Sequence, residues 1–350
     1  MTIDSMTMRV RRTGILIHRP LVIGIAGVML AVVSACGNDP GLAPGYAIVY
    51  GVARYAHISS LRQPDDDATA IASLLVDQGY TLIGDGPRLN EAATKDNLLA
   101  DFSAAAALAE PGSSFFFYFA GHGYGAGMEA YYSDPPFSQE WADYLASLEG
   151  TGATAGREGV VSFLFLHEAD PFSDVPLTIR ESIRTDELAS LLAGIRSRQK
   201  IVVMDACHSG GFIGSDGSYD TVPSSYSGSS EGISLTDAVN AASLYLSHGA
   251  LDPGAAGQAA AVISASGAHE FSYEGDWAGL SNGVFTHYFL QAPLKADRNH
   301  DGYVTVSEAY AYAAAAIASE INHRLSGDAR FLPRVSGGAV DFVLFRAIAQ

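Results

Sequence analysis

The chain has few basic residues and almost no cysteine. Its 350 residues include 20 lysines and arginines against 38 aspartates and glutamates, which gives a net charge of −18, and only two cysteines. A protein that binds a phosphate backbone needs an excess of lysine and arginine, so this composition argues against nucleic acid as a partner. Hydrophobic residues make up 48% and charged residues 17% of the chain. That balance is typical of a globular protein and excludes a disordered one.

The first cysteine, Cys36, ends an N-terminal segment that differs from the rest of the chain. Four arginines precede the apolar run 21–35, at positions 9, 11, 12 and 19. The run has the length of the hydrophobic region of a signal peptide and is short for a membrane span. It ends in Val-Ser-Ala-Cys, which resembles a bacterial lipoprotein signal, in which the cysteine becomes the lipidated first residue. An ordinary signal peptide or an uncleaved anchor is the alternative.

The lipoprotein resemblance implies an exported protein that is anchored to a membrane through lipid on Cys36. Gly37 follows where an aspartate would favour retention at the inner membrane, so the outer membrane is the expected destination. Residues 1–35 are then a signal peptide and residues 36–45 a linker rich in glycine and proline. Residues 46–350 show neither an internal repeat nor a second composition regime, so we expect one domain there.

The second cysteine, Cys207, is the only thiol of a mature chain in which Cys36 carries lipid. An intrachain disulfide is then excluded, although the compartment would permit one. A single unpaired cysteine in an exported protein is a candidate reactive thiol. The alternative is an inert, buried cysteine, and the residues around Cys207 decide between the two.

Short apolar runs alternate with helical patterns through most of the chain. Strands are predicted at 46–53, 80–85, 114–123, 201–207, 260–266 and 339–345, with an extra strand at 160–166. Helices are predicted at 64–80, 91–108, 187–195 and 283–291, the third of them capped by Thr185 or Asp186. This alternation favours an α/β fold with a mostly parallel central sheet of about six strands flanked by helices.

Two of the predicted strands end in reactive residues. Ala-Gly-His-Gly carries His122, and Asp-Ala-Cys-His-Ser-Gly-Gly carries Cys207, 85 positions later. Functional groups collect beyond the carboxyl ends of parallel strands, so neighbouring strands would bring the two side chains together. An imidazole can take the proton of a thiol nucleophile and return it to a leaving amine. The adjacent His208 is expected to point to the opposite face and to be structural.

The same residues carry a family resemblance. FFFYFAGHG followed by IVVMDACHSGGF resembles the caspase-like cysteine peptidases, especially the bacterial metacaspase or orthocaspase branch, from about residue 46 to 345. YAIVYGVARY, DDATAIASLLVDQGY and SNGVFTHYFL extend the resemblance. It implies a caspase-like fold and a cysteine endopeptidase with His122 and Cys207 as the catalytic dyad. The backbone N–H groups of Gly123 and Cys207 would stabilise the oxyanion.

The resemblance also implies a substrate pocket with two acids, Asp205 and Asp67, which would favour peptide or protein substrates with arginine or lysine before the cleaved bond. The alternatives are a strand-end acid that binds backbone N–H groups, for Asp205, and a helix N-cap, for Asp67. Two positions depart from the family pattern. Ala120 stands where a serine is usual and Pro64 where a cysteine is common, which puts the detailed pocket geometry in doubt.

A calcium-loop pattern occupies residues 297–308, DRNHDGYVTVSE. Its ligand positions are filled in the order of an EF-hand loop, with glycine at the sixth position. Predicted helices flank the loop, so Ca²⁺ in a structural or regulatory role is the expected cofactor. The alternative is a polar turn that binds no metal. The predicted ligands are Asp297, Asn299, Asp301, Tyr303 through its carbonyl, Thr305 and Glu308.

No lysine or arginine occurs between His208 and Leu294. Caspase-type enzymes are often cleaved in the loop after the nucleophile, and an enzyme specific for basic residues has no site there. We therefore expect no self-cleavage within 208–250, which mapping of fragment ends would check. Any processing is expected within 124–184, at Arg157, Arg180 or Arg184.

Two other functions are compatible with these patterns. One is a catalytically inactive, calcium-binding surface lipoprotein that uses a caspase-like fold for protein interaction. The other is a hydrolase of a different kind with a Cys-His dyad.

Overall fold

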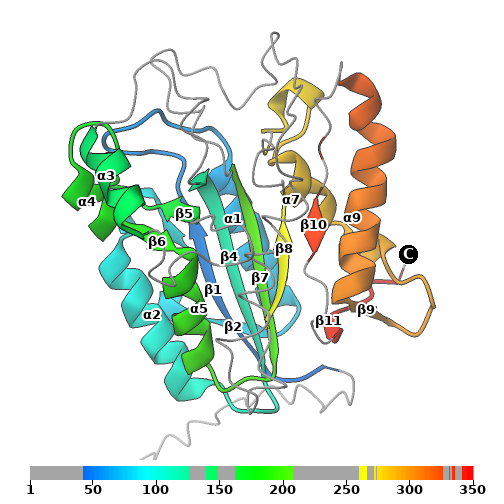
Figure 1. Ribbon diagram of the computed structural model, residues 1–350. Helices are drawn as coiled ribbons and strands as arrows, with labels where there is room; N and C mark the ends of the chain where they lie inside the picture. The colour runs from blue at the N-terminus through cyan, green and yellow to red at the C-terminus, as the bar shows by residue number, and fades with distance from the viewer. Residues whose placement is uncertain are drawn as a thin grey trace, which may run out of the picture. The chain divides into compact units, whose positions relative to one another are not determined.

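The computed structural model describes residues 42–125, 139–148, 162–207, 260–265, 272, 274–325, 331, 333–335 and 341–349 (Figure 1). Six of these, Cys207 among them, are described by their backbone alone. Residues 40–350 belong to one compact unit. The predicted signal segment, residue 36 and residue 208 lie outside the described residues. No helix among the described residues is long and apolar enough to cross a membrane.

A central, mostly parallel sheet organises the unit. Its strands run in the order β10–β8–β7–β4–β1–β2, and every pair on this path is parallel except β10 with β8. The prediction of an α/β fold with about six strands in a mostly parallel sheet is confirmed. The strands are β1 (Gly45–Gly51), β2 (Tyr80–Leu82), β4 (Ser114–Gly125), β7 (Gln199–Cys207), β8 (Ala260–Ser264) and β10 (Arg334–Val335).

Shorter strands extend the sheet at its margins. β3 (Arg88–Leu89) pairs with the end of β1, and β5 (Ser162–Phe165) pairs antiparallel with the end of β4 and with β6 (Ser182–Arg184). The extra strand predicted at 160–166 is therefore present. The apolar run at 339–345 suggested a strand of the central sheet. Instead, β11 (Val343–Arg346) pairs antiparallel with β9 (Tyr303–Thr305) in a separate two-stranded sheet.

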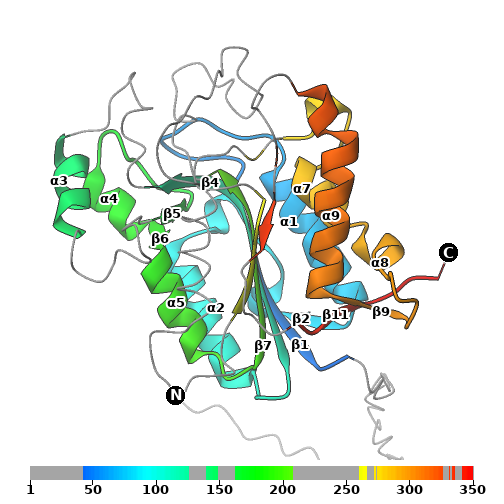
Figure 2. The ribbon, with the colours of Figure 1, turned by 45° about the vertical axis from the view of Figure 1, so that its right-hand side comes forward.

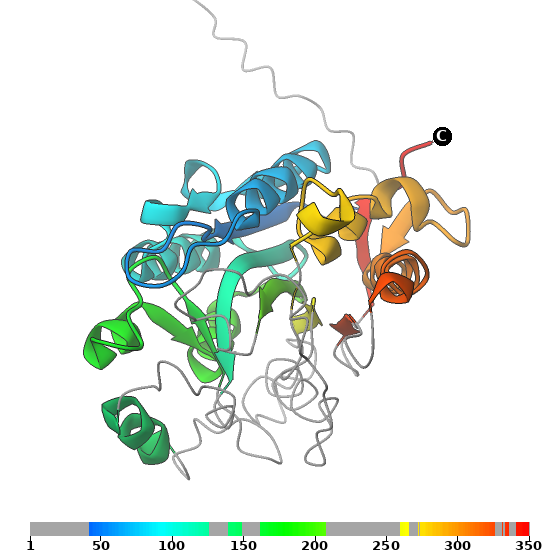
Figure 3. The ribbon, with the colours of Figure 1, turned by 90° about the horizontal axis from the view of Figure 1, so that it is seen from above.

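Helices cover both faces of the sheet (Figures 1 and 2). α1 (Pro64–Asp77), α7 (Val284–Phe289) and α9 (Val306–Glu320) cover one face, with α7 between α1 and α9 in Figure 3. α2 (Lys95–Leu108) and α5 (Thr185–Gly194) cover the other. The shorter elements are α3 (Gln139–Leu148), α4 (Val175–Arg180), α8 (Ala292–Lys295) and the 3₁₀ turns η1 (Ile83–Asp85), η2 (Asn90–Ala92), η5 (Asp276–Ala278) and η6 (Asn322–Arg324).

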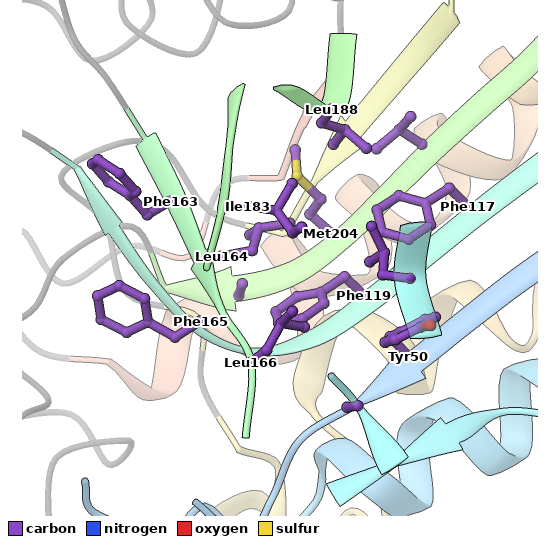
Figure 4. Close-up of a cluster of buried hydrophobic side chains, with 14 of the residues drawn as sticks. Tyr50, Phe117, Phe119, Phe163, Leu164, Phe165, Leu166, Ile183, Leu188 and Met204 are labelled. Atoms are coloured by element: carbon purple, nitrogen blue, oxygen red, sulfur yellow. The ribbon is translucent and has the colours of Figure 1, made fainter. Parts of the chain in front are cut away.

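The apolar strands are buried on both sides because each face of the sheet has its own core. On β4, residues 115, 117 and 119 pack toward α2 and α5, whereas residues 116, 118 and 120 pack toward α1, α7 and α9. This is the alternation expected of a strand, and it explains the continuous run FFFYFA. Figure 4 shows the first core, where Phe117 and Phe119 lie among side chains of β5, β6 and β7.

Two predicted helix starts were wrong. The helix predicted from residue 91 begins at Lys95, because η2 comes first and Thr94 caps α2 by accepting from the N–H of Asn97. The helix predicted to be capped by Thr185 or Asp186 begins at Thr185, with Arg184 at the N-cap. There the carboxylate of Glu187 accepts from the N–H of Arg184 at 3.1 Å.

Candidate active site

The ends of β4 and β7 bring His122 and Cys207 into register. The two strands pair in parallel over nine residues, from Ser114 opposite Gln199 to His122 opposite Cys207. Neighbouring strands lie about 4.8 Å apart, so the two backbones are adjacent at the same end of the sheet. The side chain of Cys207 is not among those described, and His208 lies outside the described residues.

The histidine is held in one orientation by the segment that follows β1. His122 is 2% exposed, and its Nε2 lies 2.8 Å from the carbonyl oxygen of Ser59. A carbonyl can only accept, so in the neutral ring Nε2 carries the proton and Nδ1 keeps a lone pair. The backbone N–H of His122 donates to Tyr55 Oη at 2.6 Å, and the two rings lie 4.8 Å apart between centroids.

Tyr55 also explains the glycine before the histidine. Its hydroxyl donates to the carbonyl of Phe165 on β5 at 3.1 Å, so it joins β5 to the end of β4. Gly121 has a φ of +153°, and a Cβ at this position would lie 2.6 Å from Tyr55 Oη. Any side chain at position 121 would therefore displace Tyr55, and with it the anchor of the His122 backbone.

Burial lowers the pKa of His122 to about 4, although its bond to Ser59 acts in the opposite direction. The imidazole is therefore neutral above that pH and is available as a proton acceptor through Nδ1. Gly123 follows directly on β4, where it stands opposite Leu164 of β5. Its predicted role as an oxyanion donor, like that of the Cys207 N–H, remains a prediction.

Two buried carboxylates, which we call the acid pair, lie on the α1/α7 face of the sheet. Asp205 on β7 accepts from Thr286 through its N–H at 3.2 Å and its hydroxyl at 2.6 Å, and also from Ser272 Oγ. Asp67 on α1 accepts from Asn282 Nδ2 at 2.8 Å and from the N–H of Gly283 at 3.0 Å. Asp67 is 3% exposed and Asp205 is 7% exposed.

Gly283 lies between the two carboxylates. A Cβ on this residue would be 2.8 Å from Asp67 Oδ2 and 3.0 Å from Asp205 Oδ2, so both oxygens border the same small volume. Burial raises the pKa of Asp67 well above its usual value, and the charge of Asp205 raises it further. Burial also raises the pKa of Asp205. Among the described residues, no lysine or arginine is bonded to either carboxylate, so the charge is uncompensated within this part of the chain.

A third carboxylate lies near the acid pair. Glu274 accepts from the backbone N–H groups of Arg62 and Gln63, the latter at 2.7 Å, and its charge contributes to the raised pKa of Asp67. Gln63, the N-cap residue of α1, in turn accepts from the N–H of Gly275 at 2.6 Å and donates to the carbonyl of Leu280. These bonds tie the start of α1 to residues 274–280.

The alternative roles were a helix N-cap for Asp67 and a strand-end acid that binds backbone N–H groups for Asp205. Asp67 is not the N-cap of α1, because Gln63 holds that position. Asp205 does accept one backbone N–H, but its other bonds come from two hydroxyl groups. Sequence reasoning missed Ser272, Asn282, Gly283 and Thr286 as partners of these acids. The last three lie in SNGVFTHYFL, where polar residues open an apolar helix, whereas no signal marked Ser272.

Asp67→Asn is expected to raise the melting temperature at pH 8 but not near pH 3. A carboxyl whose folded pKa is raised stabilises the fold fully below its unfolded pKa and loses that contribution as pH rises through the folded pKa. Asparagine escapes this penalty and keeps the acceptor for Asn282 and Gly283. Each kcal/mol gained would raise the melting temperature by about 2 °C. The exposed neighbour substitution Asp66→Asn should show no such gain, and a difference independent of pH would contradict the prediction.

The predicted calcium loop is described in full, between α8 and α9. Gly302 has a φ of +88°, and its N–H donates to Asp297 Oδ2, while the N–H groups of Asp301 and Tyr303 donate to Asn299 Oδ1 and Asp301 Oδ1. Asp297 Oδ1 is buried without a hydrogen-bond partner. Glu308 Oε2 accepts from the N–H and hydroxyl of Thr305, in a capping box at the start of α9.

These observations bear on calcium in two ways. The glycine turn and the orphaned oxygen of Asp297 fit a calcium loop. However, no group of three or more histidine, cysteine, aspartate or glutamate side chains converges as a metal site within the described residues. The donor set therefore fits Ca²⁺ in type and order, while Glu308 is engaged with Thr305.

Two of the three predicted processing sites lie in regular structure. Arg184, on β6, makes a two-bond pair with Asp186 at 2.9 Å and donates to Tyr144 Oη at 3.1 Å. Arg180 is exposed but lies within α4. Arg157 lies outside the described residues. A peptidase needs an extended segment, so Arg180 within α4 and Arg184 within β6 would have to leave regular structure before cleavage.

Comparison with known proteins identifies a family and structurally similar solved proteins. The family model described as "Caspase domain" (Peptidase_C14) matches residues 44–318. No curated protein matches. A solved structure, protein GSU0716 from Geobacter sulfurreducens, is similar at 16% sequence identity and a TM-score of 0.45, covering 84% of this chain and 94% of that one.

Proposed function

The chain belongs to the caspase-domain family, and we propose that it is a cysteine endopeptidase that cleaves after arginine or lysine. The observation that carries the proposal is the register of β4 and β7, which pairs His122 with Cys207. Two residues before Cys207 stands Asp205, one half of an acid pair with no bonded counter-charge among the described residues. The proposal thus assigns a nucleophile, a base and a site for a cation to one end of the sheet.

The proposed reaction uses these residues in sequence. Nδ1 of His122 takes the proton of the Cys207 thiol, and the sulfur attacks the peptide carbonyl carbon. The N–H groups of Gly123 and Cys207 hold the oxyanion that forms. The imidazolium then donates its proton to the leaving amine as the peptide C–N bond breaks. Water gives a proton to Nδ1 and attacks the thioester, the C–S bond breaks, and Nδ1 returns the proton to the sulfur. Throughout, the Ser59 carbonyl keeps Nε2 protonated and fixes the ring.

The acid pair supports the choice of basic substrates. Two desolvated carboxylates that repel one another gain most from a cation placed between them, and a guanidinium or ammonium group supplies one. A substrate with an uncharged residue at that position would leave the carboxylates unpaired, which is costly in a buried site.

Fluorogenic peptides that end in arginine, lysine or leucine before the reporter group test this function, with and without Ca²⁺. The wild type should cleave the first two and Cys207→Ala neither. Equal inactivity of the wild type and Cys207→Ala would contradict the peptidase proposal. It would favour the alternative of a catalytically inactive, calcium-binding lipoprotein that interacts with other proteins. Acyl transfer without peptide hydrolysis would point instead to a hydrolase of another kind.

We also propose that residues 297–308 bind Ca²⁺ through Asp297, Asn299, Asp301, Tyr303, Thr305 and Glu308. The orphaned Asp297 oxygen and the Gly302 turn support this. A hard, doubly charged ion bound there would neutralise acids that repel one another, and so stabilise the fold. Binding at 100 times the dissociation constant contributes about 2.7 kcal/mol. Ca²⁺ should therefore raise the melting temperature of the wild type by several degrees and that of Asp297→Ala much less. An equal response of both proteins, or of neither, would refute the site.

A third proposal concerns location, and it rests on the sequence before residue 42. We propose export and lipid attachment at Cys36, with the outer membrane as the destination. Cys36→Ser should then release the protein from the membrane fraction. Retention of that variant in the membrane would indicate an uncleaved anchor.

A further inference from the structure

The segment between β1 and α1, residues 52–63, serves both halves of the proposed site; we call it the β1–α1 connection. It contributes the Tyr55 hydroxyl that accepts from the N–H of His122 and the Ser59 carbonyl that binds His122 Nε2. It then leads into α1, which carries Asp67. The position of this connection therefore affects the base and the acid pair together.

Asn90 holds the beginning of the β1–α1 connection. Its Oδ1 accepts from two successive backbone N–H groups, those of Ala53 at 2.9 Å and Arg54 at 2.7 Å. These residues directly precede Tyr55. The adjoining carbonyl of Arg54 lies 2.6 Å from His167 Nδ1, and the N–H of Ala56 donates to the carbonyl of His167 at 3.0 Å. The backbone on both sides of Tyr55 is thereby fixed.

The other half of the same carboxamide reaches α1. Asn90 Nδ2 donates to Asp65 Oδ2 at 2.8 Å, and Asp65 lies in the first turn of α1, two residues before Asp67. One side chain thus joins the connection that orients His122 to the helix that carries half of the acid pair.

Few side chains fit this position. Asn90 is 2% exposed and has a φ of +49°, a conformation that asparagine, aspartate and glycine tolerate best. Aspartate offers the acceptor but no donor for Asp65, and glycine offers neither. Without an acceptor, the N–H groups of Ala53 and Arg54 lose their partner, which favours movement of the connection.

We propose that Asn90 is a positioning residue that couples the catalytic base to the acid pair. Its acceptor half orients His122 through Tyr55 and Ser59, and its donor half sets the first turn of α1 and so the place of Asp67. The proposal rests on the proposed peptidase function, because it assigns Asn90 a role in that reaction.

Two substitutions distinguish the role of the accepting oxygen of Asn90 from that of its donating nitrogen. Asn90→Gly keeps the backbone conformation and removes both, so kcat for an arginyl peptide should fall about 10- to 100-fold and KM should rise. Asn90→Asp keeps the acceptor and places a carboxylate against Asp65, so KM should rise while kcat stays within about threefold of the wild type. Asn322→Gly is the matched control, since Asn322 likewise uses both carboxamide atoms, in its case on the backbone of Phe331. It should lower the melting temperature without changing kcat or KM.

A readout that needs no peptide hydrolysis separates this proposal from the peptidase proposal. In a Cys36→Ser background Cys207 is the only thiol, so its alkylation by iodoacetamide at neutral pH reports the base beside it. Asn90→Gly should slow alkylation toward the rate of His122→Gln, and Asn322→Gly should not. If Asn90→Gly only lowers the melting temperature, with alkylation, kcat and KM as in the wild type, Asn90 is structural and the proposal fails. If no protein cleaves any peptide, the peptidase proposal fails, and the alkylation rates alone decide whether Asn90 positions His122.

Discussion

His122→Gln is expected to lower kcat for hydrolysis of an arginyl peptide by about 1,000-fold or more, with little change in KM. Glutamine can still donate to the Ser59 carbonyl and fill most of the space of the ring, but it has no atom that accepts a thiol proton near neutral pH. The loss should therefore fall on the chemical step. Single-turnover measurements with the same peptide would separate that step from binding.

His167→Gln is the matched control for this substitution. His167 is also a buried histidine that binds a backbone oxygen, the carbonyl of Arg54, but it does not stand opposite Cys207. The substitution acts on the fold around Tyr55. The factor by which it lowers kcat should be less than a tenth of the factor for His122→Gln. A His122→Gln enzyme that retains a tenth or more of the wild-type kcat would show that the imidazole is not the base.

Asp205→Asn is expected to lower kcat/KM for arginyl and lysyl peptides by about 100-fold, and for a leucyl peptide far less. The substitution keeps size and leaves an oxygen that accepts from Thr286, but removes one charge of the acid pair. In the complex, the carboxylate of Asp205 and the cation of the substrate would form a buried pair of opposite charges. Removing one partner of such a pair costs about 2–5 kcal/mol, which corresponds to a factor of roughly 30 or more in kcat/KM. Asp67→Asn should act in the same direction.

The ratio of arginyl to leucyl activity is the quantity to compare. Asp170→Asn changes another buried acid, one that accepts from the N–H of Ser173, and should leave this ratio unchanged. An equal loss on both peptides after Asp205→Asn would mean that Asp205 supports the fold around Thr286 and does not read the substrate.

The repulsive acid pair also has a cost in stability. Asp67 and Asp205 both have raised pKa values because they are buried, and a side chain at Gly283 would press on both carboxylates. A folded protein that needed only stability would place an apolar residue or a basic partner there. The presence of two acids here is compatible with the cation-binding role proposed above.

The sheet was predictable from the sequence because its strands are buried on both faces and read as continuous apolar runs. The proximity of His122 and Cys207 followed from the rule that parallel strands end at one edge, and it needed no knowledge of the register. The break at η2 was not predictable, since Asn90 takes a positive φ in order to bind the β1–α1 connection, a contact made across the fold. Local helix propensity does not register such a distant contact, so the sequence pattern placed the start of α2 at residue 91 and not at Lys95.

The partners of the reactive groups were harder to foresee than the groups themselves. Tyr55 and Ser59 lie 67 and 63 positions from His122, and Thr286 lies 81 positions from Asp205. Hydroxyl and carbonyl groups are common in every loop, so spacing alone does not select the few that the fold brings to a given histidine or aspartate. The pairing of β11 was unpredictable for a related reason. Its apolar run fits either sheet, and only its partner β9 distinguishes them.

The most direct test of the proposed site is covalent labelling of the wild type by an arginyl peptide that carries an acyloxymethyl ketone. We expect one adduct, on Cys207, formed much faster than with the leucyl analogue and slowed strongly by either His122→Gln or Asp205→Asn. Labelling elsewhere, or labelling of Cys207 at equal rates by both peptides and in all three proteins, would contradict a site in which β4 and β7 join a thiol, its base and an acid pair.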